Sequence, residues 1–274
     1  MTDVQGRTAF ITGGANGIGL GIARGLARAG ARLVLADVDD EALARAKVEL
    51  EPVAPVQTFR LDVRDREAYA RTADAAERAQ GPVSLLFNNA GVAGGAAAHR
   101  MTYELWDWGL GINLYGVVNG VQTFLPRMVE RGQGGHIVNT ASGAGLAATG
   151  SGALYTTAKY GVVGLSESLH GELASARIGV SVLCPGPVAT DIVRRTAEMA
   201  PNAGGLRTPE QDAEAAARRE RSARWLHRDG VDIDTVGEMV LSAVRAERLY
   251  ILTDRFVEPL IKARTQALLD ALPT

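Results

Sequence analysis

The feature that most restricts the fold of this chain is a series of short apolar runs, each separated from the next by a longer helical pattern. Strands that are apolar throughout are typical of a parallel sheet, because helices cover both of its faces. The runs predict strands at residues 8–12, 32–37, 56–61, 83–88, 136–141, 179–184 and 249–253. This alternation predicts an α/β fold built on a doubly wound, Rossmann-type parallel sheet.

The helical patterns complete this fold, and the region after Pro187 departs from it. Regular helices are predicted at residues 17–29, 39–50, 65–80, 102–131, 154–175, 233–246 and 254–272. Residues 188–230 are rich in Ala, Arg and Glu and broken by Pro and Gly, which predicts two short helices with a mobile connection. Because no repeat and no second core is evident, residues 1–274 are predicted to form a single domain with 188–230 as a substrate lid.

The composition argues against several classes of protein. A net charge of −2 gives no electrostatic reason to expect nucleic acid or an anionic membrane surface as a partner. No stretch approaches the ~18 apolar residues of a membrane span, and no basic segment followed by a long apolar run suggests a signal peptide. The single cysteine, Cys184, excludes an internal disulfide and fits a reducing cytoplasm. The histidines have no ligand-like spacing, so no metal site is expected.

A glycine-rich turn joins the first predicted strand to the first predicted helix. It reads TGGANGIG over residues 12–19, with the spacing G-x-x-x-G-x-G and not G-x-G-x-x-G. Such a turn can be purely structural. Between the first strand and the first helix, however, it lets the backbone approach a pyrophosphate, and the helix N-terminus offers free N–H groups. The cofactor-binding residues predicted here are Gly13, Asn16, Gly17, Ile18 and Gly19.

Acidic residues follow the second and third predicted strands. Asp37 ends the second strand, where a carboxylate can accept hydrogen bonds from an adenosine ribose. The alternative for Asp37 is a helix cap, for which Asp39 is the better candidate. Asp62 and Val63 follow the third strand and are expected to face the same crevice, with a plain helix cap as the alternative for Asp62.

Tyr155 and Lys159 lie four residues apart, which on a helix places both side chains on one face. A tyrosine is a poor acid–base group at neutral pH, because its reference pKa is near ~10. A nearby ammonium stabilises the phenolate and lowers that pKa, so the pair can work as a general acid–base. The spacing alone is weak evidence, since surface helices contain it often.

Two further polar residues favour the catalytic interpretation. Ser142 follows the fifth predicted strand, where its hydroxyl can hydrogen-bond a substrate oxygen, although it could be a simple turn serine. Asn113 lies inside a predicted long helix, where asparagine is a mediocre helix former. Solvent exposure would be a sufficient alternative reason for an asparagine there.

Together these motifs resemble the short-chain dehydrogenase/reductase superfamily. The matching features are Thr12 to Gly19, Asp62, Asn88-Asn89-Ala90-Gly91, Asn113, Ser142, Tyr155-x-x-x-Lys159 and Pro185-Gly186-Pro187-Val188-Ala189-Thr190. They occur in the family's order and cover about residues 6–191. The region 188–274 lies outside the well-matched part.

The resemblance implies a role for each of these residues. Tyr155 would be the proton donor and acceptor, Lys159 would lower its pKa and hold the nicotinamide ribose, and Ser142 would position the substrate oxygen. Asn113 would anchor a water that links Lys159 to solvent, and Asn88 looks more structural. The residues implied in cofactor binding besides the glycine turn are Asp37, Asp62, Val63, Asn89, Ala90, Gly91, Pro185, Gly186, Val188 and Thr190.

The implied activity is hydride transfer between a nicotinamide cofactor and a secondary alcohol or ketone. NAD is expected over NADP, because Asp37 would face the 2′-phosphate as a like charge. The sequence places no basic residue beside it: Val38 follows, the glycine turn carries none, and Arg32 begins the strand at its other end. The alternatives are a dehydratase or epimerase of the same fold, or a non-catalytic nucleotide-binding regulator, because the sequence patterns that predict the fold would be the same in each.

Two expectations concern the substrate and the assembly. The predicted lid holds Ile192, Val193, Met199, Leu206, Trp225 and Leu226, which suggests an apolar, possibly aromatic substrate, although these residues could simply pack the lid. The helices predicted at 102–131 and 154–175 carry more apolar residues than one sheet face can cover. With the resemblance, this predicts a homo-oligomer, either a tetramer or a dimer.

Overall fold

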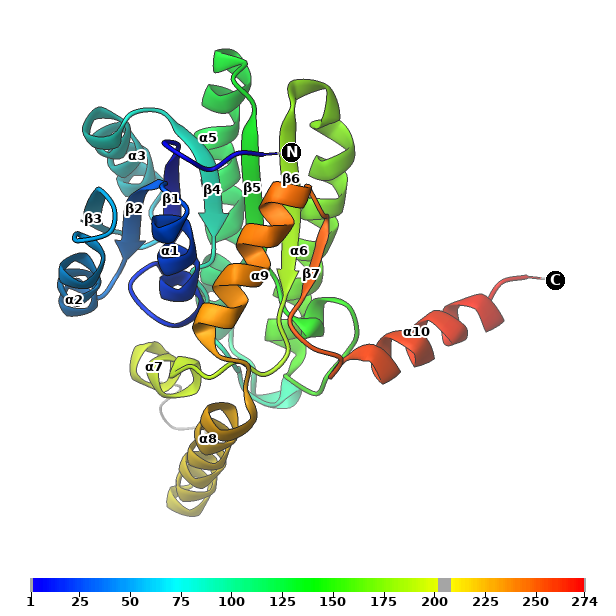
Figure 1. Cartoon of the computed structure of the whole chain (residues 1–274). Helices are drawn as coiled ribbons and strands as arrows, with labels where there is room; N and C mark the ends of the chain where they lie inside the picture. Colours follow the sequence, from blue (N-terminus) through cyan, green and yellow to red (C-terminus); the bar gives the residue numbers. More distant parts are fainter. Residues whose placement is uncertain (1, 202–207, 274) are drawn as a thin grey trace.

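The computed structural model describes residues 2–201 and 208–273, and in them seven strands form one parallel sheet (Figure 1). The strands are β1 (Thr8–Thr12), β2 (Arg32–Asp37), β3 (Val56–Arg60), β4 (Val83–Asn88), β5 (Gly135–Thr140), β6 (Ile178–Cys184) and β7 (Tyr250–Leu252). Their order across the sheet is β3-β2-β1-β4-β5-β6-β7, and every neighbouring pair is parallel. The predicted Rossmann-type doubly wound fold is confirmed.

Helices cover both faces of the sheet, as the apolar strands require. The helices are α1 (Gly17–Arg28), α2 (Asp40–Leu50), α3 (Arg66–Gln80), α4 (Tyr103–Leu110), α5 (Gly116–Arg131), α6 (Ala153–Glu172), α7 (Ile192–Met199), α8 (Pro209–Asp229), α9 (Ile233–Ala246) and α10 (Glu258–Asp270). One apolar cluster joins α1, α2 and α9 to one face of the sheet, and a second joins α3, α5 and α6 to the other face (Figure 1). This burial of apolar surface on both faces is the main stabilising contribution to the fold.

The long helical region expected at 102–131 is found, but it is not one regular α-helix, because a π-helical turn, Gly111–Tyr115, lies between α4 and α5. The helix packs closely on the loop after β3 just past this turn, where a Cβ added at Gly116 would lie 2.7 Å from Val63 Cγ2. The buried side chain of Asn113, inside this turn, pairs with the backbone of Val92. Turns of this kind occur often at functional sites.

The region 188–230 also differs from the expectation of two short helices. The first, α7, has 8 residues, but the second, α8, has 21. Thr208 and Gln211 form a capping box that starts α8, since each side chain accepts the other's backbone N–H. The expected mobile connection falls largely on residues 202–207, which lie outside the described residues.

Two helices project from the body of the domain (Figure 1). Both α8 and α10 extend away from the sheet, and α10 has no buried residue along its described length. Among the described residues, no helix is both long enough and apolar enough to cross a membrane.

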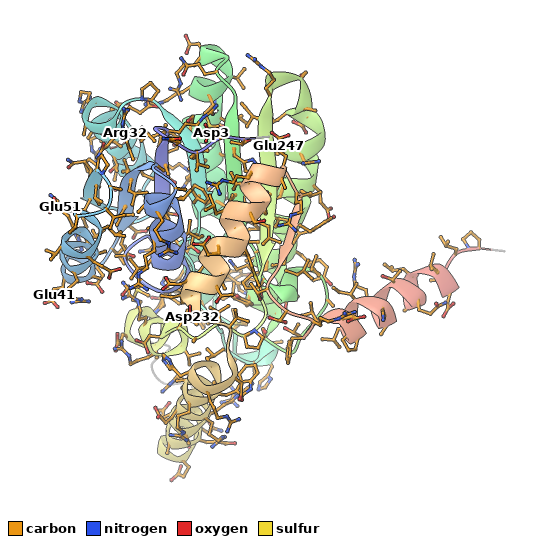
Figure 2. All side chains as sticks on the ribbon, in the orientation of Figure 1. Asp3, Arg32, Glu41, Glu51, Asp232 and Glu247 are labelled. Atoms are coloured by element: carbon orange, nitrogen blue, oxygen red, sulfur yellow. The ribbon has the colours of Figure 1, made fainter. Side chains whose placement is uncertain are left out.

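Asp232 and Glu247 mark the two ends of α9 (Figure 2). The Asp232 carboxylate caps the helix by accepting the N–H groups of Asp234 and Thr235. Arg32, at the start of β2, lies near the Glu247 end of the molecule, far from α7 (Figure 2). The carboxyl ends of the strands therefore lie at the Asp232 end.

Acid should destabilise the fold through His136, which is fully buried in β5. Burial lowers its pKa from 6.5 to about 4. Below pH ~6.5 the unfolded chain binds a proton that the folded chain resists, so this contribution to stability is present above that pH and lost as the pH falls. We expect the free energy of unfolding to fall by about 3 kcal/mol between pH 6.5 and 4 through this residue.

Denaturant titrations of the wild type and of His136→Gln at several pH values measure this loss. The variant retains a polar atom near Ser181, the partner of His136 at 2.8 Å. Its pH dependence should be shallower than that of the wild type across this window. Parallel curves would show that His136 does not control acid stability.

Candidate active site

The candidate site lies where the carboxyl ends of the strands meet the loops that follow them. In the sheet order, β1 and β4 are the neighbours at which the chain changes direction across the sheet. Ligands of open parallel sheets bind in the crevice at such a switch point. The glycine turn after β1 and the loop after β4 both open onto this point.

The glycine turn is tightly packed, and Gly13 and Gly19 leave no room for a side chain. A Cβ at Gly19 would overlap the Gly13 carbonyl oxygen, and one at Gly13 would lie 2.9 Å from Ala90 Cα. Gly13 and Gly17 adopt positive φ angles of 61° and 49°, which glycine tolerates best. Ile18 lies in the first turn of α1, and its partly buried side chain packs on the core. The turn therefore presents backbone to the crevice.

Asn16 shows that the turn is incomplete by itself. Its Nδ2 is buried and has no hydrogen-bond partner among the described residues. A buried amide donor without a partner is costly, and in a phosphate cradle a ligand oxygen would satisfy it. The turn therefore fits the pyrophosphate of a dinucleotide.

Asn89 fastens this turn to the neighbouring strand. Its Nδ2 donates to the carbonyl oxygens of Thr12 and Gly13, at 3.2 and 3.3 Å, and its Oδ1 accepts the Thr140 hydroxyl. The Thr12 hydroxyl accepts the N–H groups of Asn89 and Ala90. Asn89 and Thr12 thus join the glycine turn to the segment after β4, a role that the motif containing Thr12 did not reveal.

Asp37 is placed at the end of β2 and is 6 % exposed. Its Oδ2 accepts the N–H of Ala15 in the glycine turn at 3.3 Å, and its Oδ1 accepts the N–H of Asp39. Burial raises the pKa of the Asp37 carboxyl, and the charge of Arg195 opposes that rise. Asp39 caps α2 by accepting the N–H of Ala42, so the cap belongs to Asp39 as the sequence suggested.

Asp62 and Val63 follow β3 but have protein partners of their own. The Asp62 carboxylate makes a two-pronged ion pair with Arg64, which holds its pKa below the usual value. Val63 is buried, and its carbonyl accepts the side chain of Asn119. The cap of α3 is Asp65, so the helix-cap alternative for Asp62 is wrong.

The side chain of Asn113 is hydrogen-bonded to the loop after β4. Its Oδ1 accepts the N–H of Val92 and its Nδ2 donates to the Val92 carbonyl, both at 3.0 Å. It is 2 % exposed, which removes the solvent-exposed alternative. A Cβ at Gly91 would lie 3.0 Å from Asn113 Oδ1 and 3.6 Å from Lys159 Nζ, so these three residues adjoin.

Tyr155, Lys159 and Ser142 come together at the carboxyl end of β5. Lys159 Nζ lies 5.7 Å from the centre of the Tyr155 ring and donates to the Thr140 carbonyl at 2.9 Å. The Ser142 hydroxyl accepts the N–H of Ala144, which makes it the turn serine that the alternative described, and its side chain also hydrogen-bonds Tyr155. Burial lowers the pKa of Lys159 to about 8.

The expected lowering of the Tyr155 pKa is not found in this structure. Burial raises the pKa of the phenol, and the hydrogen bond with Ser142 offsets only part of that rise. Burial is the dominant cause, and the ammonium of Lys159 donates to the Thr140 carbonyl and faces the Tyr155 ring.

The segment after β6 closes the site from the other side. The Pro185 carbonyl accepts the N–H of Gly143, and the Gly186 N–H donates to Thr253 Oγ1. Val188 is buried and forms a parallel bridge with Val231. A Cβ at Gly17 would lie 3.2 Å from Thr190 Cγ2, so this segment reaches the glycine turn.

Comparison of the sequence with known protein families identifies the family to which this site belongs. The model of the short chain dehydrogenase family matches residues 7–201, which include the glycine turn, Tyr155 and Lys159. The chain belongs to the short-chain dehydrogenase family.

Relatives of this dehydrogenase extend over nearly its whole length. A Cα-dehydrogenase of a Sphingobium species is 36 % identical over 274 residues, 99 % of this chain and 88 % of the relative. A CLA biosynthesis dehydrogenase/reductase of Lactiplantibacillus plantarum is 31 % identical, over 100 % of this chain and 97 % of the relative. The solved structure of a short-chain dehydrogenase/reductase from Burkholderia phymatum in complex with NAD superimposes with a TM-score of 0.90 at 35 % identity, over 100 % of this chain and 98 % of that one.

As a short-chain dehydrogenase, the protein is an oxidoreductase that acts on CH–OH groups. The predicted superfamily is thereby confirmed. Arg195, on α7, is the residue of the site that sequence reasoning missed entirely. It pairs with Asp39 over a separation of 156 residues, so no local pattern could have shown it.

Proposed function

We propose that this short-chain dehydrogenase transfers a hydride between NAD(H) and a secondary alcohol or the corresponding ketone. The observation that carries the proposal is the placement of Tyr155, Lys159 and Ser142 at the same sheet edge as the glycine turn. When bound, the nicotinamide supplies or accepts the hydride. The proposed cofactor-binding residues are Gly13, Asn16, Gly17, Ile18, Gly19, Asp37, Asp62, Val63, Asn89, Ala90, Gly91, Tyr155, Lys159, Pro185, Gly186, Val188 and Thr190.

In the oxidation direction, Tyr155 takes the proton of the alcohol, whose oxygen Ser142 orients. The Lys159 ammonium faces the Tyr155 ring and donates to the Thr140 carbonyl, so its stabilisation of the phenolate is proposed for the enzyme with cofactor and substrate bound. Asn113 holds the loop at Val92, and its role as the anchor of a water beside Lys159 stays a prediction.

A panel of secondary alcohols with NAD, followed by the absorbance of the reduced cofactor, tests the reaction. We expect the absorbance to rise with at least one alcohol of the panel. A chain that dehydrates or epimerises its substrate, or only binds nucleotide, would produce no net change.

NAD is proposed as the preferred cofactor because the Asp37 carboxylate, buried at the end of β2, suits the ribose hydroxyls of NAD. We expect Asp37→Ala to narrow the ratio of kcat/KM between NAD and NADP about tenfold, mainly by removing like-charge repulsion. Glu41→Ala is the matched control, since Glu41 lies on the outer side of α2 (Figure 2). Equal efficiency of the two cofactors in the wild type would contradict the assignment of Asp37.

An apolar or aromatic substrate is proposed from the residues beside Ser142. Trp225 of α8 and Phe256 face one another with ring centres 6.0 Å apart, and both are partly exposed. A Cβ at Gly143, next to Ser142, would overlap Val257, so the turn that carries Phe256 adjoins the catalytic serine. The two rings are therefore available to an aromatic substrate at this edge.

Trp225→Ala should raise KM for an aromatic secondary alcohol by about 3- to 10-fold, as expected for the loss of one aromatic contact. The rise should be smaller for a short aliphatic alcohol. Tyr103→Ala removes an aromatic side chain that is 89 % exposed and serves as the control. A uniform rise for both alcohols would indicate that Trp225 only packs α8.

The single domain with a lid at 188–230 is likewise a proposal. Contacts of α7 with both sides of the crevice support it: Arg195 reaches Asp39, and the Thr196 hydroxyl accepts the N–H of Ala93 at 2.8 Å. Hydrogen exchange of the described part of this segment should slow when cofactor and substrate bind. A hydrogen-exchange rate that is the same with and without cofactor and substrate would contradict a lid.

We propose that the protein forms a homotetramer, with a dimer as the smaller assembly. The exposed apolar surface of α5 and of the turn before it supports this proposal. Tyr115 and Val129 remain 50 % and 48 % exposed there. A stable monomer in sedimentation at micromolar concentration would contradict it.

Cytoplasmic location is proposed because the single cysteine, Cys184, is free and buried.

A further inference from the structure

Arg195 occupies the position where the cofactor's adenosine ribose would meet the end of β2. Its Nη1 lies 3.0 Å from Asp39 Oδ2, and its Nη2 lies 3.6 Å from Asp37 Oδ1. The guanidinium is 21 % exposed and Asp37 is 6 % exposed, so neither charge is fully screened by water. Two carboxylates and one guanidinium therefore share the place that distinguishes NAD from NADP.

The other basic residues near this place have partners or positions of their own. Arg45, whose charge also acts on Asp39, is 67 % exposed and lies 3.8 Å from Glu41. Arg60, the neighbour of Asp37 on β3, is 71 % exposed and pairs with Asp40. Arg64 is committed to Asp62. Arg32 lies at the opposite end of the sheet from α7 (Figure 2). Among these, Arg195 alone contacts Asp37.

Arg195 is held there by the position of α7. Thr196, the next residue, binds the backbone of Ala93 on the other side of the crevice. Thr190, shortly before α7, adjoins Gly17 of the glycine turn. These contacts place α7 across the crevice, with Arg195 directed toward β2.

We propose that Arg195 is a second determinant of cofactor choice, which balances Asp37 and Asp39 and offers a guanidinium to a 2′-phosphate. This inference rests on the proposed NAD site. A guanidinium has five N–H donors, and it matches phosphate oxygens in a two-pronged geometry. NADP-binding sites present a basic residue at this place, and here α7 supplies one instead of β2 or the glycine turn. The preference for NAD is thus smaller than Asp37 alone would produce.

Calorimetric titration with ADP-ribose and with 2′-phospho-ADP-ribose at low salt tests this without catalysis. In Arg195→Ala, the Kd of the phosphorylated ligand should rise about tenfold, while that of ADP-ribose stays within about twofold. Arg195→Lys should restore part of the affinity for the phosphorylated ligand, because lysine keeps the charge but lacks the paired N–H donors of the guanidinium. Arg194→Ala is the matched control, since Arg194 is 59 % exposed and pairs with Asp191 and Glu198.

A double-variant cycle adds a second criterion. Asp37→Ala should tighten binding of the phosphorylated ligand when Arg195 is present, and do so less in the Arg195→Ala background. If Arg195→Ala changed the Kd values of both ligands equally, Arg195 would only hold α7 in place. If neither Kd value changed, Arg195 would have no role in binding either ligand. Either result overturns the proposal while the NAD site stands. Failure of the wild type to bind ADP-ribose would overturn both.

Discussion

Replacing Tyr155 with phenylalanine is expected to lower kcat by a factor of about 10²–10⁴, the usual contribution of general acid–base catalysis. The substitution removes only the hydroxyl, so the Kd of the dinucleotide should change little. Stopped-flow and steady-state rates with an oxidisable alcohol, together with direct titration of the cofactor, measure the two quantities separately.

Tyr160→Phe is the matched control for this experiment. Tyr160 lies on the same helix, and its ring contacts Arg264 at 5.4 Å, a contact that phenylalanine would retain. The control should keep nearly full activity. If Tyr155→Phe retained more than about a tenth of the wild-type rate, its hydroxyl would not be the acid–base group.

Gly19→Ala is expected to abolish dinucleotide binding, raising its Kd beyond about 100-fold. The added methyl group would overlap the Gly13 carbonyl and approach Asn89 Nδ2 to 2.7 Å. Relief requires the glycine turn to separate from β4, and the backbone N–H groups then lose their alignment with the pyrophosphate. Titration with ADP-ribose measures this loss.

Gly164→Ala adds the same methyl group to helix α6, where nothing lies within 4 Å of the new atom. It should leave binding unchanged and stabilise the fold slightly, since alanine is the better helix former by about 0.5–1 kcal/mol. A Gly19→Ala protein that folds and binds the dinucleotide normally would mean that the turn is not the phosphate cradle.

The sheet could be predicted from the sequence because its signals are local. A strand such as β1 or β4 is mostly apolar and is buried at every position, and the glycine turn lies between β1 and α1 where a phosphate site requires it. The spacing of Tyr155 and Lys159 likewise needs only one helix. Local periodicity therefore suffices for the order of the strands and helices and for most of the candidate site.

Features that depend on contacts between distant segments could not be predicted. At the π-helical turn Gly111–Tyr115, Asn113 pairs with Val92 and Gly116 packs on Val63, and neither contact has a local signature. The pairing of Arg195 with Asp39 joins segments 156 residues apart. The pKa of Tyr155 moved opposite to expectation because burial, which spacing does not report, outweighs the neighbouring hydroxyl.

In the proposed reaction a hydride passes directly between the substrate carbon and the nicotinamide. An alcohol that carries deuterium on its carbinol carbon, oxidised by the enzyme with NAD, reveals this transfer by mass spectrometry of the cofactor. We expect one deuterium in the reduced cofactor for each ketone formed, with Tyr155→Phe forming almost none. Deuterium released to water, or product formed without reduced cofactor, would contradict this direct transfer.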